Sequence, residues 1–339
     1  MNGRLLVFNC HEAWVYQLHL LRRPLDVVVD LPGRHLRGWD SAVRPLPPLA
    51  RLVSLGDVRA SRETYDCILA HNLTDLLDVK TLPGPRLLVI HLTLDGMILE
   101  QRAKTERRDF QRATARFLSM SRAHVMAVSL LKGRSWGFTN EEDVVPLTAD
   151  PADYLPWQGD RAAALRIASF VMRRPQTLLW SLHQQAFADV PVTLVGHNPE
   201  LPGVRPSRDW DELKRILQHH RFYIHTADPN LEDGYNTATL EAMAAGLPVL
   251  GNCHPTSPIQ HGVNGFLSDD PVELKSYAQQ LLADHELARQ MGQAAQRTVL
   301  EQFSGEAFRT GMLRCIEEAQ RLWHLPGADT SLGGNHRDQ

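Results

Sequence analysis

The sequence predicts an α/β protein of two doubly wound, Rossmann-like domains that face each other across a central cleft. Three observations lead to this prediction. The length of 339 residues is typical of two domains. Short apolar runs alternate with longer helical patterns in both halves of the chain. A stretch rich in proline and turn formers, residues 147–157, separates the two series and is the expected linker and hinge.

Each series of apolar runs has the order expected of a parallel sheet. The first comprises residues 4–8, 26–30, 67–70, 86–90 and 125–128. The second comprises residues 165–169, 192–195, 222–225, 248–250 and 265–267. We therefore place an N-terminal domain at residues 1–152 and a C-terminal domain at residues 153–305. A terminal helix, residues 306–324, is expected to pack back toward the N-terminal domain, and residues 325–339, poor in apolar side chains, form a predicted disordered tail.

Composition narrows the class of protein. Hydrophobic residues make up 43% and charged residues 22%, as in ordinary globular domains, and a net charge of −3 gives no reason to expect nucleic acid as a partner. The four cysteines form no Cys-x-x-Cys pair, which argues against a zinc site and a disulfide framework. No signal-peptide pattern opens the chain and no apolar run approaches the length of a membrane span, so we expect a cytoplasmic protein.

The most informative segment sets two carboxylates, Asp233 and Glu241, on either side of a loop-to-helix junction. Gly234 and Asn236 suit a tight turn, Thr237 can cap a helix, and Glu241 then lies about one turn inside that helix. The free N–H groups and positive dipole end of a helix N-terminus suit a diphosphate. Carboxylates accept hydrogen bonds from sugar hydroxyls. The segment therefore indicates a nucleotide-sugar site, and the alternative is a surface turn followed by an ordinary core helix.

This segment resembles the donor-site signature of retaining glycosyltransferases with the GT-B fold, family four in the usual sequence classification. The resemblance rests on an acid at position 233, seven intervening residues, and then Glu-Ala-Met-Ala-Ala-Gly-Leu-Pro-Val from position 241. It continues upstream through residues 210–213 and 221–226, and downstream through residues 261–267 and 286–303. Residues 160–323 match well, and the N-terminal half matches more loosely.

The resemblance implies transfer of a hexose from a nucleoside diphosphate sugar to a hydroxyl acceptor, with retention at the anomeric carbon and without a metal or cofactor. A UDP- or GDP-sugar is the expected donor, and a carbohydrate or lipid-linked molecule is the expected acceptor. The C-terminal domain would then bind the donor and the N-terminal domain the acceptor. Polysaccharide or glycolipid biosynthesis is the implied setting.

The same resemblance assigns the site residues. His91, at the carboxyl end of a buried strand, and Asp233 are the expected catalytic residues that contact the transferred sugar. A strand-end histidine that only bonds a nearby carbonyl is the alternative for His91. The expected residues around the donor nucleotide and diphosphate are Arg173, Arg174, Gly196, Gly234, Tyr235, Asn236, Thr237 and Glu241.

The chain departs from the family pattern at three places. The family begins its motif with Glu, whereas this chain has Asp233, and Glu232 lies one position too early. Two adjacent arginines replace the spaced Arg and Lys expected for the diphosphate, with two solvated arginines as the alternative. The usual Gly-rich first turn is replaced by residues 8–15, where Glu12 and Trp14 suit a sugar acceptor; Trp14 could equally belong to a buried helix stripe.

Two further segments carry alternatives. The stretch Arg102 to Arg122 is basic on balance, which indicates either peripheral contact with an anionic membrane surface at the inner membrane face or a solvated helix with internal charge pairs. The pair Asp209 and Asp211 has the spacing of a metal-binding motif but opens a predicted helix, so we interpret it as capping.

Two other functions use the same fold and motif. A nucleotide-sugar epimerase would recruit an acid or base against the sugar C2 proton and need no acceptor. A catalytically degenerate binding protein is the second alternative, motivated by Asp233 and the irregular arginine pair.

Overall fold

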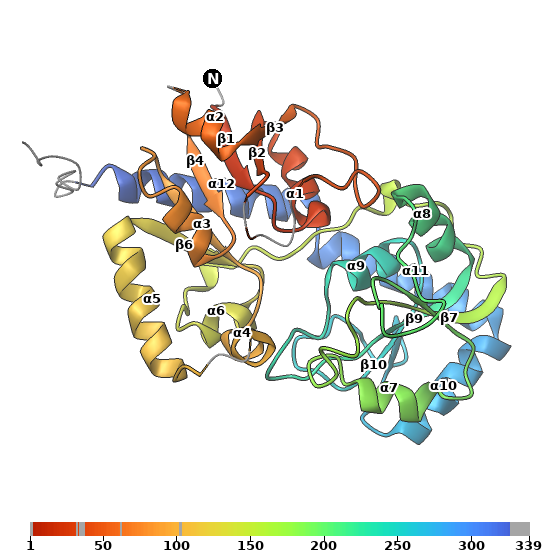
Figure 1. Ribbon diagram of the computed structural model, residues 1–339. Coiled ribbons are helices and arrows are strands. Elements are labelled where there is room, and N and C mark those ends of the chain that lie inside the picture. Colours follow the sequence, from red (N-terminus) through yellow and green to blue (C-terminus); the bar gives the residue numbers. More distant parts are fainter. Residues whose placement is uncertain (1–2, 32, 34–37, 62, 102–103, 326–339) are drawn as a thin grey trace, which may run out of the picture.

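The computed structural model describes residues 3–31, 33, 38–61, 63–101 and 104–325, and they form two α/β domains with helix α12 (Gly305–Trp323) running along the first (Figure 1). The predicted fold class is confirmed, since both sheets are entirely parallel in the described pairings. The predicted tail lies, beyond residue 325, outside the described residues.

The N-terminal sheet has the strand order β3-β2-β1-β4-β5-β6. Its strands are β1 (Leu5–Phe8), β2 (Leu25–Val29), β3 (Ala50–Ser54), β4 (Cys67–Ala70), β5 (Arg86–Ile90) and β6 (Ala123–Ala127). Its helices are α1 (Glu12–Gln17), the 3₁₀ turn η1 (Leu18–Leu21), α2 (Leu55–Ala60), α3 (Leu73–Asp78), α4 (Leu94–Gln101), α5 (Arg107–Ser121) and α6 (Leu130–Ser135). The short 3₁₀ turns η2 (Glu141–Asp143) and η3 (Pro151–Asp153) follow.

The C-terminal sheet has the strand order β11-β10-β9-β7-β8. Its strands are β7 (Arg161–Ile167), β8 (Val192–Val195), β9 (His220–His225), β10 (Val249–Gly251) and β11 (Gly265–Leu267). Its helices are α7 (Trp180–Phe187), α8 (Trp210–His219), α9 (Thr237–Ala244), α10 (Pro271–Ala283) and α11 (His285–Gln302).

Strand β3 is absent from the prediction, and its burial explains why. Its residues are exposed or half-buried, because it forms the edge of the sheet, whereas β1, β2, β4 and β5 are buried throughout. An edge strand needs no continuous apolar run. Strand β7 begins at Arg161, four residues before the predicted start, for a related reason: Arg161 and Ala162 are exposed.

Each sheet has one point where the direction of winding reverses. In the first sheet β1 lies between β2 and β4, so the reversal falls between β1 and β4. In the second sheet it falls between β7 and β9. Loops that follow the strands at such a switch point commonly bind ligands. We therefore expect ligands at the loops that follow β1, β4, β7 and β9.

Helix α12 ties the C-terminal end of the described chain to the N-terminal domain. The Gln320 side chain donates to the Asp66 carbonyl, and Arg122 donates to the carbonyls of Trp323 and Leu325. Its buried face includes Phe308, which lies edge-on to Trp14 at 6.3 Å. None of the described helices is both long and apolar enough to cross a membrane.

Candidate active site between the two domains

Helix α9 begins at the predicted junction, with one correction. Asn236, not Thr237, is the N-cap: its backbone is extended and its side chain accepts from the Thr239 N–H, while the Thr239 hydroxyl accepts from the Asn236 N–H. Thr237 is the first helical residue. At the other end, Gly246 adopts a left-handed φ of +88° and closes the helix. The helix therefore begins at the loop-to-helix junction that the sequence predicts.

Glu241 lies inside α9, 5% exposed, and meets a partner that the sequence did not reveal. It forms an ion pair with Arg44, which comes from the loop between β2 and β3 of the other domain and is 4% exposed. The Arg44 guanidinium lies 4.5 Å from the centre of the Trp210 ring. The carboxylate expected to bind the ribose is thus already paired across the cleft.

Asp233 is 1% exposed and also meets a cation of the N-terminal domain. Lys132 Nζ, from α6, lies 3.1 Å from Asp233 Oδ2 and 2.7 Å from Glu232 Oε1. Burial disfavours the charged Lys132, but the carboxylates of Glu232 and Asp233 outweigh it and raise the Lys132 pKa. Burial acts to raise the Glu232 pKa, yet Lys132 and the Asp233 backbone N–H lower it on balance. Lys132 and Glu232 are therefore both charged at neutral pH.

One carboxylate oxygen of the acidic pair Glu232 and Asp233 has no hydrogen-bond partner. Asp233 Oδ1 is buried without a hydrogen-bond partner. Buried carboxylate oxygens normally accept hydrogen bonds, and an unsatisfied one is costly. Gly234 next to it is required by space, since a Cβ there would lie 2.8 Å from the His254 ring. The loop is thus held tightly, and one buried carboxylate oxygen has no partner among the described residues.

The two arginines of the predicted diphosphate site behave differently. Arg174 is half-buried, binds Glu100 of α4 at 2.6 Å and lies 3.7 Å from Glu232. Arg173 is largely exposed and pairs with Glu200 at 2.8 Å. Only Arg174 therefore lies at the cleft with the acidic pair. Arg173 matches the solvated alternative in this structure.

Gly196 packs closely against the loop after β7, which carries the two arginines. It has a φ of +143°, and a Cβ there would lie 2.3 Å from the Ala168 carbonyl oxygen. The following Asn198 accepts from the Val171 N–H and donates to the Ala168 carbonyl. The glycine thus allows the loops after β7 and β8 to touch, and this contact fixes the loop that carries Arg174.

Tyr235, Glu12 and Trp14 are buried. Tyr235, 8% exposed, packs against Phe303 at 5.1 Å. Glu12 accepts from the Asn9 side chain and the Asp40 N–H, so it organises the loop that carries Arg44. Trp14 is 2% exposed, so the buried-stripe alternative describes it and the ring offers no open face to an acceptor.

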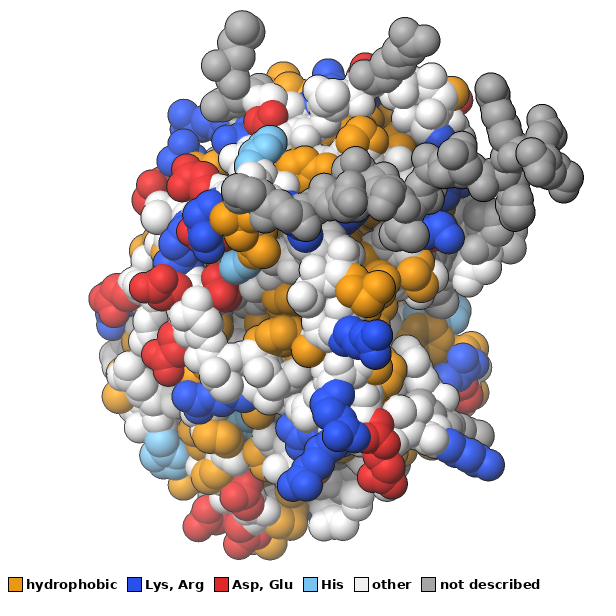
Figure 2. Space-filling model, turned by 90° about the vertical axis from the view of Figure 1, so that its left-hand side faces the viewer, with side chains coloured by type: hydrophobic (Ala, Val, Ile, Leu, Met, Phe, Trp, Pro, Cys, Tyr) orange, Lys and Arg blue, Asp and Glu red, His pale blue; other side chains and the backbone are white. Residues whose placement is uncertain are grey.

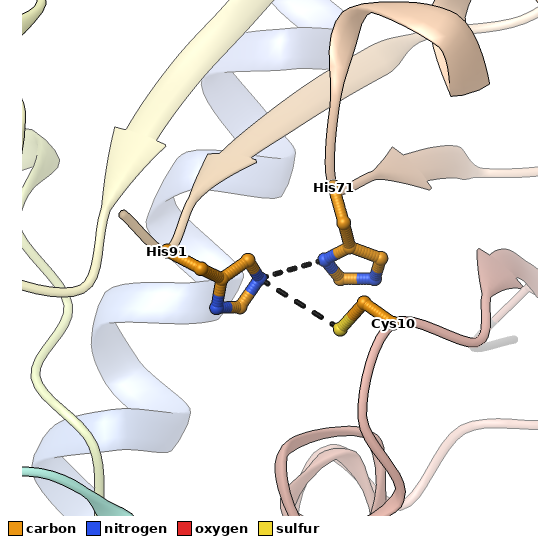
Figure 3. Close-up of side chains that lie close together, drawn as sticks. All are labelled: Cys10, His71 and His91. Carbon is orange, nitrogen blue, oxygen red and sulfur yellow. Dashed lines mark hydrogen bonds between the residues drawn. The ribbon is translucent and has the colours of Figure 1, made fainter. Parts of the chain in front are cut away.

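His91 follows β5 as predicted and is half-buried. Burial, together with the nearby His71, Lys132 and His11, lowers its pKa well below the ordinary value, so the ring is neutral. Lys132 therefore lies near both predicted catalytic residues, His91 on its own domain and Asp233 on the other. Figure 3 shows His91 with two neighbours that sequence reasoning did not select, His71 and Cys10.

The predicted basic helix is interrupted. Residues 102–103, and with them Arg102, lie outside the described residues, and α5 begins at Arg107. Figure 2 shows this side of the molecule, where Lys and Arg side chains gather low on the face with carboxylates and hydrophobic side chains among them. Arg112 pairs with Asp109, and Arg107 with Asp95. The Asp209 side chain caps α8, as predicted, by accepting from the Glu212 N–H.

Sequence comparison finds a family match within the C-terminal domain. Residues 173–308 match the family described as Glycosyl transferase-like. N-acetyl-alpha-D-glucosaminyl L-malate synthase of Bacillus anthracis is 40% identical over 79 residues. This region covers 22% of the chain and 21% of that enzyme, so the match spans about a fifth of the relative's length.

Solved structures extend the likeness to both domains. Sucrose-phosphate synthase from Thermosynechococcus elongatus superposes with a TM-score of 0.65 at 14% identity, covering 94% of this chain and 99% of that one. Anabaena HepE, solved in complex with UDP and glucose, gives a TM-score of 0.66 at 14% identity, covering 93% and 100%. The chain thus has the two-domain GT-B fold of these solved structures, and residues 173–308 match the family described as Glycosyl transferase-like.

Proposed function

We propose that the protein is a glycosyltransferase that moves a hexose from a nucleoside diphosphate sugar to a hydroxyl acceptor, with retention at the anomeric carbon. The observation that carries this proposal is that Asp233 and Glu241, on either side of the N-terminus of α9, both meet the N-terminal domain, where Lys132 lies near His91. The family match of residues 173–308 supports it.

The nucleotide is proposed from the relatives. HepE was solved with UDP, with UDP and glucose, and with UDP-glucose. The curated relative is named for N-acetylglucosaminyl transfer to L-malate. We therefore place a UDP-sugar first among the candidate donors and expect a hydroxyl-bearing acceptor. A carbohydrate or lipid-linked acceptor, a cytoplasmic location, membrane contact through α5 and independence from metals and cofactors remain predictions.

The chemistry follows from charge development in the transition state. As the glycosidic bond breaks, negative charge gathers on the leaving diphosphate, and the free N–H groups at the start of α9 together with Arg174 would stabilise it. Glu241 would hold the ribose hydroxyls once Arg44 moves away. Asp233 Oδ1 and His91 would bind the hexose and fix the anomeric carbon near the acceptor. The acceptor hydroxyl would then attack from the face that the leaving diphosphate vacates and pass its proton to an oxygen of that diphosphate.

The two alternatives are less well supported. The named relatives are transferases and synthases rather than epimerases. The replacement of the family Glu by Asp233 motivates a degenerate binding protein, but the unsatisfied Asp233 oxygen favours a site that still receives a ligand.

A thermal-shift panel with UDP, GDP, ADP, dTDP and CMP tests the donor site. A ligand at 100 times its dissociation constant stabilises the fold by about 2.7 kcal/mol. We expect one diphosphate to raise the Tm selectively, and the shift to disappear in Glu241→Ala. Glu286→Ala, on an exposed face of α11, is the matched control. The absence of a shift with every nucleotide would reject the donor site.

Product analysis then tests the reaction. Incubation with the selected nucleotide sugar and candidate acceptors should release the nucleoside diphosphate, and NMR of the glycoside should show the donor's anomeric configuration. Inversion of configuration would contradict the proposed mechanism, and a 2-epimeric sugar without transfer would indicate the epimerase.

A further inference from the structure

Three side chains with metal-binding atoms meet where the loops after β1, β4 and β5 leave the N-terminal sheet: Cys10, His71 and His91 (Figure 3). These strands are neighbours in the sheet, so their loops emerge side by side. His71 Nδ1 lies 2.8 Å from His91 Nε2, and Cys10 Sγ lies 3.9 Å from the same His91 nitrogen. The three atoms all lie within 4.8 Å of one another. Two imidazole nitrogens and one sulfur therefore face a common point.

These separations are close to those of a tetrahedral zinc site. With Zn–N bonds of about 2.0–2.1 Å and Zn–S bonds of about 2.3 Å, two ligand nitrogens lie roughly 3.3 Å apart, and a nitrogen and a sulfur roughly 3.5 Å apart. The imidazoles would have to separate by about 0.5 Å and the thiol approach by about 0.4 Å, which small side-chain rotations provide. A set of two nitrogens and a sulfur suits Zn²⁺, whereas Mg²⁺ and Ca²⁺ prefer oxygen ligands.

The neighbouring side chains hold the two imidazoles in place. The Trp14 ring packs edge-on against both of them, at 4.9 Å and 5.0 Å. The backbone N–H of His71 donates to Asp75 Oδ2, and the Asp75 N–H donates to the side chain of Asn72, the N-cap of α3. Ligands that are fixed in this way need little reordering when an ion binds.

The charges around the group favour a positive ion. The carboxylates of Asp75 and Glu12 add to the effect of burial and raise the pKa of the Cys10 thiol. The same negative charges stabilise a cation at this place. Burial lowers the pKa of both imidazoles, so the rings are neutral, which is the form that ligates a metal. Lys132 acts against positive charge at His91, but its own charge is balanced by its two carboxylate partners.

We propose that Cys10 Sγ, His71 Nδ1 and His91 Nε2 bind one Zn²⁺ ion. Binding replaces the thiol proton, which leaves to the solvent, and the one hydrogen between the facing nitrogens moves to the far nitrogen of its ring. No fourth residue joins the group in the part of the chain that the structure describes, so the fourth position is left for a water or a hydroxyl. The ligands come from three separate loops, and for this reason no spacing in the sequence indicates them.

The zinc site does not rest on the proposed function. All three ligands belong to the N-terminal domain, whereas the residues expected around the diphosphate belong to the C-terminal domain. We assign the ion no step in the transfer, so the prediction of a metal-independent reaction is unaffected. His91 Nδ1 lies on the far edge of the ring (Figure 3) and would remain available to the hexose.

Titration of the full chain with Co²⁺ tests the site, after a chelator has removed any metal carried through purification. Co²⁺ substitutes for Zn²⁺, and a cobalt–thiolate bond gives a charge-transfer absorption. We expect this absorption to saturate at one Co²⁺ per chain and to disappear when Zn²⁺ is added. Cys10→Ala should abolish it. His71→Ala and His91→Ala should each weaken binding by at least about 100-fold, because even substitutions behind metal ligands cost about 10–100-fold.

Two control variants locate the ion. Cys253→Ala removes an exposed cysteine outside the group, and His124→Gln disrupts the second group of possible ligands, His124, Asp143 and Cys315. Both should bind Co²⁺ like the wild type. Thermal unfolding adds a readout that needs no thiolate absorption. Zn²⁺ should raise the Tm of the wild type and of both controls but not that of Cys10→Ala, whose cooperative unfolding without metal shows that it is folded.

Three results would overturn the proposal: no absorption that saturates at one Co²⁺ per chain, an absorption that persists in Cys10→Ala, or an absorption lost in His124→Gln but retained in His71→Ala and His91→Ala. The nucleotide panel answers a separate question. Zinc binding by the wild type that is lost in Cys10→Ala, without a Tm shift from any nucleotide, would support the zinc site and reject the donor site.

Discussion

Lys132 is the residue on which the acidic part of the cleft depends. It is buried with Glu232 and Asp233 and crosses from one domain to the other to reach them. Two buried carboxylates without a cation would repel each other and lack solvation. Lys132 thus joins the domains and gives both buried carboxylates a cationic partner.

We expect Lys132→Met to lower the free energy of unfolding by about 3–5 kcal/mol, the usual cost of removing one partner from a buried ion pair. Urea denaturation measures it. The double variant Lys132→Met/Glu232→Gln removes one of the stranded charges and should recover part of the loss. Arg134→Met, which breaks the exposed pair with Glu141, is the control and should cost at most about 1 kcal/mol. Equal effects of the buried and exposed variants would contradict the role assigned to Lys132.

Asn236 starts α9, because its side chain accepts from the Thr239 N–H and its own N–H donates to the Thr239 hydroxyl. Helix α9 is itself almost wholly buried, and Gly292 of α11 allows the close approach, since a Cβ there would lie 1.9 Å from the Gly246 carbonyl oxygen. A helix held this firmly presents its N–H groups at a fixed position, as electrostatic stabilisation of a diphosphate requires.

Asn236→Ala should lower the free energy of unfolding by about 1 kcal/mol, the usual cost of losing an N-cap, and should weaken nucleotide binding as well. The matched control is Asp270→Ala, which removes the N-cap of α10 and should cost a similar amount of stability. Calorimetric titration with the nucleotide selected by the thermal-shift panel separates the two. Weaker binding in the Asp270 variant by the same factor would show that the effect is only one of stability.

At the scale of the whole molecule, opposite charges join the domains across the cleft. Arg44 meets Glu241, Lys132 meets Glu232 and Asp233, and Glu100 meets Arg174. The Thr93 hydroxyl also donates to the Leu231 carbonyl at 2.6 Å. In each ion pair, the residue that belongs to the C-terminal domain lies at the expected donor site or next to it. On the proposed function, a nucleotide sugar would compete with the N-terminal domain for these groups.

Arg44→Ala tests this competition. If Arg44 must leave Glu241 before the ribose can bind, the variant should bind the nucleoside diphosphate several-fold more tightly than the wild type while being less stable without it. Calorimetric titration gives the affinity, and Arg205→Ala, which breaks an exposed pair with Glu212, serves as the control. Weaker binding in Arg44→Ala would mean that the guanidinium itself contacts the nucleotide.

Buried neutral histidines make the stability of the whole molecule pH-dependent. Burial lowers the pKa of His225 to about 4 and, with Arg166 nearby, that of His183 to about 3. The unfolded chain binds protons at these histidines below pH about 6.5 while the folded chain does not, so the free energy of unfolding falls as the pH drops from 6.5 toward 4. The slope reaches about 1.4 kcal/mol per pH unit for each such histidine.

Urea denaturation at pH 7.5 and pH 5.5 should show a lower free energy of unfolding at the lower pH. The decrease should be smaller in His183→Phe, because phenylalanine cannot take up a proton. His324→Phe, at the exposed end of α12, is the control and should retain the wild-type slope. An unchanged slope in His183→Phe would contradict the neutral state assigned to that ring.

The two-domain α/β fold could be predicted from the sequence, as could ten of the eleven strands in the described residues to within a few residues and the loop-to-helix segment from Asp233 to Gly246. These features are local: buried parallel strands need apolar runs, and a helix end needs a cap and a glycine. The exposed edge strand β3 lacked that signal. Only the tertiary structure decided that Arg44 meets Glu241, that Lys132 meets Asp233 and that His71 meets His91, because each pair joins residues from separate loops and no periodicity links them.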